Sequence, residues 1–281
     1  MPTNGLFTPG EVLTAGNTNA LLTRGYGNRI INGNFVINQR VYTSGTNLAS
    51  GVYGFDRWRS GFTNTSLTFT AGSQSTTVTI SASGVLQQVI ERENMPAGTY
   101  TLSWSGTATG RIYNVGATPP AYGASPRIVT LDGSANVMVE FTASGGTRTL
   151  SLVQVEGGNV FSPFQYRHRA EELALCYRYY EKSYELGTAL GTVTTINSSY
   201  IIYGTFTGVH QGSAQFYATK RVLPTVRAYS PITGTIDRIH LNGFGDTNYG
   251  NTAIGSNRIT LGAGTLTASG VLYHYTADSE I

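Results

Sequence analysis

The sequence predicts an all-β protein in which a single α-helix joins two β bodies, each a sandwich or a barrel. Only 12% of the residues are charged and 35 are glycine, which is typical of many short strands joined by tight turns. Apolar and polar residues alternate in several segments, as they do in strands with one buried face. One block, residues 163–184, has instead the spacing of an amphipathic helix.

The N-terminal segment, residues 1–28, differs from the rest of the chain. Residues 19–22 form a candidate helical turn, but the segment has too little apolar bulk for a core of its own. Such an end is either frayed or held by a partner, and we favour a partner. The side chains expected to dock are Phe7, Val12, Leu13, Leu21 and Leu22.

Residues 29–165 are expected to form the first β domain. Tyr100, Leu102 and Trp104 alternate with hydroxyl residues, and the segment around Val137 and Phe141 repeats the pattern. Turn signals recur at roughly ten-residue intervals, which favours a sandwich or a barrel.

The helical block is expected to link the domains. Its apolar and aromatic stripe recurs at helical spacing and is more consistent with packing than with chemistry. The stripe consists of Leu173, Cys176, Tyr177, Tyr180 and Tyr184. Cys176 is the single cysteine, which rules out an intrachain disulfide and suits a buried core position.

Residues 166–281 are expected to contain this helix and a second β body. Residues 186–219 include no Asp, Glu, Lys or Arg. Strand-like pieces follow at residues 225–229, 235–241, 258–261 and 270–275. We find no short-period repeat, which argues against a solenoid or a propeller.

Composition excludes several classes of function. The net charge is only +3 and no run of Lys or Arg accompanies it, so a nucleic-acid groove is not expected. No apolar run approaches the ~20 residues of a membrane-spanning helix, so we expect no membrane insertion. The chain does not begin with a signal-peptide pattern, so we expect synthesis in a cytoplasm.

No catalytic motif is present, and we expect a protein that is not an enzyme. The sequence lacks a nucleophile elbow, a P-loop and an H-E-x-x-H pair. Glu91 and Glu93 would share one face of a strand, which we interpret as a solvated face rather than as a glycosidase pair. His168 and Glu171 lie three residues apart, but nothing completes a metal-ligand set.

The most distinctive candidate for recognition is the glycine-rich loop at residues 241–251. Aromatic side chains among Asn and Asp residues are typical of adaptable binding loops, although a plain polar hairpin tip fits the loop equally well. The candidate glycan-binding residues are Asn242, Phe244, Asp246, Asn248 and Tyr249, with Tyr53 from the first domain. Further aromatic candidates in the first domain are Tyr42, Tyr113 and Tyr122.

Three blocks together resemble the tail-fibre and appendage proteins of tailed bacteriophages. Residues 28–40 (NRIINGNFVINQR) and 53–58 (YGFDRW) resemble the opening of that family's carbohydrate-binding-module-like jelly roll. Residues 161–182, from FSPFQYR to EELALCYRYYEK, resemble the domain junction of that family. Residues 273–281 (YHYTADSEI) resemble the C-terminus of its members. Residues 7–15 (FTPGEVLTA) also look like the opening of a phage protein.

The resemblance implies two jelly-roll-like β-sandwiches and a structural role in the virion. Appendages of that family are typically trimeric. Our leading hypothesis is a homotrimer that docks to other tail or capsid proteins through its N-terminal segment and contacts host-surface polysaccharide through distal loops. Two alternatives remain: a head-fibre, collar or tail decoration that binds no receptor, and a polysaccharide-degrading appendage.

The motif Asp56-Arg57-Trp58 allows two interpretations. The structural one buries Trp58 in the sandwich, while Asp56 caps a turn or pairs with Arg40. The resemblance also makes Asp56 a weak candidate ligand for a structural Ca²⁺ ion. We expect no other cofactor.

Overall fold

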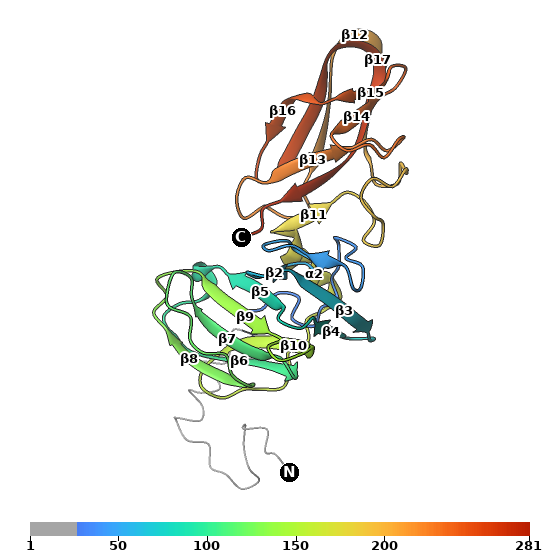
Figure 1. Cartoon of the computed structure of the whole chain (residues 1–281). Coiled ribbons are helices and arrows are strands. Elements are labelled where there is room, and N and C mark those ends of the chain that lie inside the picture. Colours follow the sequence, from blue (N-terminus) through green and yellow to red (C-terminus); the bar gives the residue numbers. More distant parts are fainter. Residues whose placement is uncertain (1–26) are drawn as a thin grey trace. The chain divides into compact units, whose positions relative to one another are not determined.

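The computed structural model describes residues 27–281, apart from the side chains at 203–204 and 251–252, and its fold is almost entirely β (Figure 1). The predicted all-β class with one α-helix is therefore confirmed for the described residues. The predicted docking residues Phe7, Val12, Leu13, Leu21 and Leu22 lie outside the described part of the chain.

The chain divides into two compact units. The first comprises the residues up to Ile37 together with Tyr42–Arg169, and the second comprises Asn38–Val41 and Ala170–Ile281. The division thus falls after Arg169 rather than after residue 165, and the short segment 38–41 belongs with the later part of the sequence.

The first unit is a sandwich of two antiparallel sheets. The six-stranded sheet has the order β1 (Asn47–Leu48), β3 (Thr65–Ala71), β4 (Thr76–Ile80), β10 (Arg148–Gly157), β6 (Gly98–Gly106), β8 (Arg127–Leu131). The four-stranded sheet has the order β2 (Arg59–Ser60), β5 (Val85–Ile90), β9 (Val137–Thr142), β7 (Thr109–Asn114). This jelly-roll-like arrangement buries one aromatic-rich core.

Trp58 lies at the centre of that core, as the structural interpretation of its motif predicts. Its ring is fully buried and stacks on Phe35 with 4.9 Å between centroids, and its indole N–H donates to the carbonyl oxygen of Asn32 at 2.9 Å. The predicted strand through Tyr100, Leu102 and Trp104 is β6, and all three side chains are buried.

Two local predictions are wrong. Glu91 and Glu93 do not share a strand face, because Arg92–Asn94 form the 3₁₀ turn η1. The helix α2 spans Arg169–Tyr177 and not residues 163–184, since Tyr180–Lys182 form the strand β11, which pairs with the last strand of the sequence. Tyr180 and Tyr184 therefore do not belong to a helical stripe.

The second unit is organised around one long strand, β17 (Arg258–Asp278), which pairs with five others. They are β11, β12 (Ser199–Gln215), β13 (Thr225–Tyr229), β14 (Arg238–Leu241) and β16 (Gly250–Ile254), and β15 (Gly245–Asn248) pairs with β14. β17 pairs along both edges: Leu272 lies opposite Tyr200 on one side and His240 on the other.

The β12–β17 ribbon bends back on itself. Ser199 and Ser213, 14 residues apart in β12, are joined by a hydrogen bond of 3.4 Å. A straight strand would hold them roughly 46 Å apart. The Tyr273 hydroxyl of β17 likewise donates to the carbonyl oxygen of Gly212 at 2.7 Å. The ribbon thus supplies two packed layers, with a second core between them.

Among the described residues, no helix is long and apolar enough to cross a membrane.

Candidate functional site

The predicted recognition loop is a hairpin of β14 and β15. Arg238 lies opposite Asn248, and Leu241 opposite Gly245, so residues 242–244 form the turn. Gly243 and Gly245 have φ of 84° and 113°, values that favour glycine over residues with a side chain. Asn242 and Phe244 therefore lie at the end of the hairpin.

Asn242 connects the hairpin end to the first residues of β12. Its side-chain amide donates to the Tyr200 hydroxyl at 3.1 Å, and its backbone N–H donates to the carbonyl oxygen of Gly270 at 3.0 Å. Gly270 in turn lies opposite Ile202 in the β12–β17 ladder. The contacts place Tyr200, Ile202 and Asn242 side by side.

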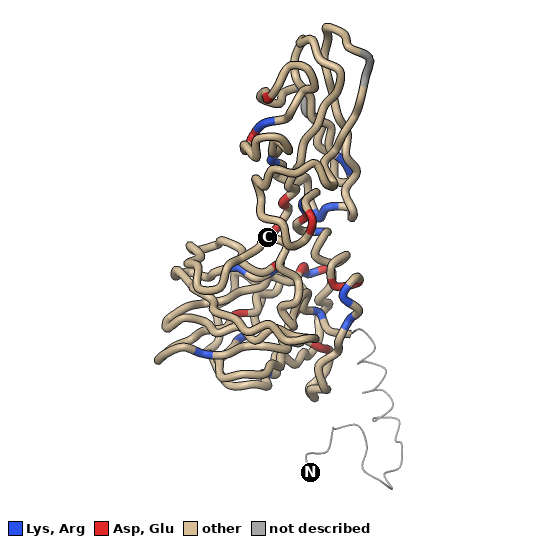
Figure 2. Tube along the Cα trace, turned by 90° about the vertical axis from the view of Figure 1, so that its right-hand side faces the viewer, with Lys and Arg blue, Asp and Glu red and all other residues tan. Residues whose placement is uncertain are grey.

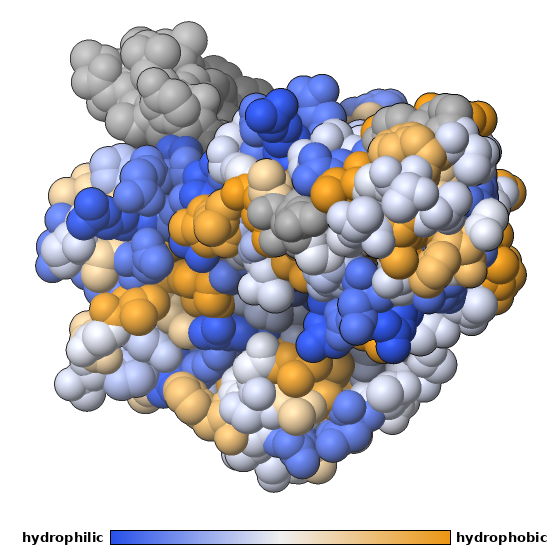
Figure 3. Space-filling model, turned by 90° about the horizontal axis from the view of Figure 1, so that it is seen from above, coloured by the Kyte–Doolittle hydropathy of each residue, from blue (hydrophilic) through white to orange (hydrophobic). Residues whose placement is uncertain are grey.

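We call these residues, together with Phe244 two positions beyond Asn242 in the turn, the tip cluster. Phe244 is 53% exposed, Tyr200 49% and Ile202 66%. In the view of Figure 3 apolar side chains reach the surface in several separate patches. Exposed aromatic side chains beside a fixed amide suit a ligand that has both an apolar face and hydroxyl groups.

The Asp246 carboxylate accepts several hydrogen bonds from its neighbours in the second unit. It accepts hydrogen bonds from Ser230 and from His240, both at 2.8 Å, and another from Thr233. Burial alone would raise the pKa of this carboxyl, but the donors on Thr233, His240 and Ser230 outweigh burial and lower it. Asp246 is therefore ionised and anchors residues 230–233 to β15.

The remaining predicted residues do not join the tip cluster. Asn248 lies at the opposite end of β15, where its amide oxygen accepts a hydrogen bond from Arg238. Tyr249 is half-buried and packs against the core of the second unit. Tyr53 belongs to the first unit, where it forms a β-bridge with Arg59.

A second polar constellation crosses the four-stranded sheet of the first unit. The ladder places Arg59, Gln87, Glu140 and Arg111 in one row, one residue from each strand. Gln87 donates to Glu140 at 2.5 Å, and the Arg111 Nε donates to it at 2.8 Å. Sequence reasoning missed this row because only the strand register brings the four residues together.

An aromatic side chain, that of Tyr122, contacts two members of this row. The Tyr122 hydroxyl donates to Glu140, and the Arg111 guanidinium lies 4.0 Å from the centroid of the Tyr122 ring. Burial and the Glu140 hydrogen bond raise the pKa of Tyr122, which keeps this donor protonated. Glu140 is fully buried and both of its oxygens are satisfied, so the row stabilises the sheet face.

The residues of the predicted helical stripe have packing roles. Cys176 is buried, Leu173 is half-buried, and Tyr177 stacks on Tyr217 with 4.9 Å between centroids. Tyr184 stacks on His274 at 3.7 Å.

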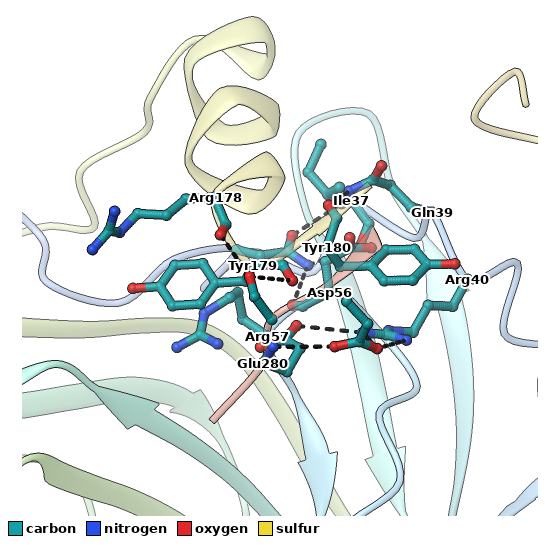
Figure 4. Close-up of polar contacts among 12 residues, drawn as sticks. Ile37, Gln39, Arg40, Asp56, Arg57, Arg178, Tyr179, Tyr180 and Glu280 are labelled. Atoms are coloured by element: carbon teal, nitrogen blue, oxygen red, sulfur yellow. Dashed lines mark hydrogen bonds and ion pairs between the residues drawn. The ribbon is translucent and has the colours of Figure 1, made fainter. Parts of the chain in front are cut away.

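Tyr180 lies beside Arg40 of the segment 38–41. The Arg40 guanidinium is 3.7 Å from the centroid of the Tyr180 ring (Figure 4). Arg40 also pairs with Asp278 at 3.1 Å and with Glu280 at 3.6 Å. These contacts hold the segment 38–41 in the second unit.

A buried ion pair connects β11 with residue 220. The Lys220 Nζ lies 2.5 Å from the Glu181 carboxylate, and neither side chain is exposed. Glu181 also accepts from the Tyr275 hydroxyl at 2.9 Å and from the backbone N–H of Tyr217 at 3.0 Å. Burial raises the pKa of Glu181, an effect that Lys220 opposes.

The described residues offer no evident metal centre. No group of three or more His, Cys, Asp or Glu residues comes together between residues 27 and 281. Asp56 is buried in the turn that ends at Trp58, whose backbone N–H donates to the carbonyl oxygen of Phe55 at 2.9 Å.

Comparisons with known proteins find similarity among solved structures, but not among family models or curated proteins. No protein-family model matches the chain, and no curated protein matches it. Among solved structures, a cycloisomaltooligosaccharide glucanotransferase of Paenibacillus sp., complexed with cycloisomaltoheptaose, is similar at 11% identity and a TM-score of 0.23. The match covers 84% of this chain and 46% of that one.

Proposed function

We propose that this protein is a non-enzymatic structural subunit of a phage virion appendage, a tail fibre or a similar structure, that contacts host-surface glycan. The observation that supports the glycan contact is the tip cluster, in which Tyr200, Ile202 and Phe244 are exposed and the Asn242 amide is held by the Tyr200 hydroxyl. The resemblance of three sequence blocks to phage appendage proteins supports the virion role.

The chemistry of the tip cluster suits a sugar. The C–H face of a sugar ring packs against an aromatic ring, while its hydroxyl groups bond to amides and tyrosine oxygens. The Asn242 amide and the Tyr200 hydroxyl fix each other at 3.1 Å, so both are held in position before a ligand arrives. Such preorganisation lowers the entropy lost on binding.

Exposed aliphatic side chains support self-association, for which we propose a homotrimer. Loops 186–198 and 230–236 lie against each other, since any side chain at Gly234 would collide with the carbonyl oxygen of Gly191. Together they expose five aliphatic side chains: Leu190, Val193, Ile196, Ile232 and Ile236. An apolar surface of this kind is typical of sites where protein chains associate.

Attachment to other virion tail or capsid proteins is assigned to residues 1–28 by the sequence resemblance. The alternative function is a purely structural decoration of the head, collar or tail. Both functions need the same attachment, so only binding to host cells separates them.

Competition with virion adsorption tests the proposal. The full chain should bind cells of the bacterial host and should slow adsorption of virions that carry it. Phe244→Ala should weaken both effects, whereas Leu223→Ala, which removes another exposed apolar side chain of the second unit, should not. Normal virion incorporation without any cell binding would favour the purely structural alternative.

A further inference from the structure

The tip cluster is built from segments that carry no charge. Its residues come from stretches 186–219, 239–245 and 259–277, none of which contains Asp, Glu, Lys or Arg. In Figure 2 the β12–β17 ribbon is drawn tan around its bend, apart from the residues that are not described. A ligand at the tip cluster therefore meets aromatic, aliphatic, amide and hydroxyl groups of uncharged segments.

The nearest charge that follows in the hairpin is negative. Asp246 lies two residues beyond Phe244, and its low pKa keeps it ionised above the acid range. Its partners Ser230 and Thr233 are neutral donors, and its third partner, His240, lies opposite it in the hairpin and has its Nδ1 already engaged by this carboxylate at 2.8 Å. The hairpin's Arg238 lies opposite Asn248, three β15 residues further from the turn than Gly245.

From this charge distribution we infer that the tip cluster recognises a neutral sugar, and not the carboxylate, sulfate or phosphate groups of an acidic polysaccharide. Arg and Lys are the side chains that bind such anions most strongly, and the tip cluster supplies neither. An acidic ligand would also lose hydration and meet the field of Asp246. This inference rests on the proposed function, because it specifies the ligand of the same site.

Immobilised polysaccharides of opposite charge type test the inference with the full chain. The neutral probes are dextran, galactan and chitin oligosaccharides, and the acidic probes are alginate and polygalacturonate. We expect binding to at least one neutral probe, with affinity unchanged within about twofold between roughly 50 and 500 mM salt, since no ion pair contributes. Phe244→Ala should weaken this binding by about tenfold or more, whereas the control Leu223→Ala should not.

Two results would overturn the inference, and they differ in what they say of the proposed function. Binding to the acidic probes alone, with affinity that falls steeply as salt rises, would reject a neutral ligand while leaving glycan contact intact. Binding to neither probe class, together with no binding to host cells, would reject both.

Discussion

Removal of one member of the buried Glu181–Lys220 pair should destabilise the second unit strongly. We consider Lys220→Met, which keeps the length and apolar stem of the side chain and deletes its charge. The Nζ of Lys220 also donates to the carbonyl oxygen of Tyr177, so the substitution leaves two acceptors without this donor. Glu181 would stay fully buried without its cation.

The expected magnitude follows from the geometry. At 2.5 Å and an effective dielectric constant of about 20, the attraction between the two charges is roughly 6–7 kcal/mol. Glu181 can take up a proton in the variant, which limits the loss, so we expect a decrease of about 3–5 kcal/mol in the free energy of unfolding. For a unit of this size that corresponds to a melting temperature lower by about 12–20 °C.

The effect should depend on pH with a definite sign. Without Lys220, burial raises the pKa of Glu181 further above its value in the unfolded chain. A raised folded-state pKa contributes stability below the unfolded pKa, and that contribution is lost as pH rises through the folded pKa. The deficit of the variant relative to the wild type should therefore shrink as pH falls from 8 toward about 5.

Calorimetry combined with tryptophan fluorescence provides the assay. Both tryptophans, Trp58 and Trp104, lie in the first unit, so their fluorescence follows that unit and calorimetry follows the whole chain. The control is Arg227→Met, which breaks the exposed pair with Asp237 and should cost less than about 1 kcal/mol. A change for Lys220→Met as small as the control's, or a deficit that grows at low pH, would refute the reasoning.

Three further predictions concern the other clusters. Glu140→Ala should lower the stability of the first unit by about 3–5 kcal/mol, because it leaves the largely buried charge of Arg111 without its carboxylate partner. Unfolding followed by tryptophan fluorescence measures this loss, and an unchanged transition would mean that water replaces the carboxylate. Tyr249→Ala should lower the free energy of unfolding by about 2–3 kcal/mol, whereas Phe244→Ala should change it little, because Tyr249 packs against the core and Phe244 is exposed. Equal losses in thermal unfolding would contradict this placement. Ile196→Asp should reduce the mass of the assembled protein in analytical ultracentrifugation, and an unchanged mass would remove loop 186–198 from the self-association surface.

The sequence predicts the β class well because alternation and turn signals are local. Its main error in the fold, the overlong helix, has a non-local cause. Residues 180–182 continue the apolar and aromatic spacing of α2, but they pair instead with Thr276–Asp278, about a hundred residues further along the chain. The segments predicted at 258–261 and 270–275 are likewise parts of one strand, β17, because its partners extend across the glycines between them.

The candidate site is predictable only in part, for the same reason. Turn residues such as Asn242 and Phe244 are visible in the sequence as a hairpin end, but their neighbour Tyr200 reaches them through the β12–β17 register. Tyr249 looks identical in sequence to an exposed aromatic residue, and only packing identifies it as part of the core. The Glu140 row has no local signature, since each strand contributes one residue.

The central position of β17 has a consequence for biosynthesis. Five strands of the second unit pair with a strand that ends at Asp278. Strand β14 can pair first with β15, but among the described strands β11, β12, β13 and β16 pair only with β17, so they have no partner until the ribosome has released residues 258–278. The first unit contains all of its paired strands before residue 170 and can fold while synthesis continues. The uncharged strand β12, by contrast, leaves the ribosome before β17 does. Its backbone hydrogen-bonding groups therefore stay unpaired on the nascent chain until β17 follows. Rapid translation of the last hundred residues, or a chaperone that covers β12, would protect the protein from aggregation during this interval.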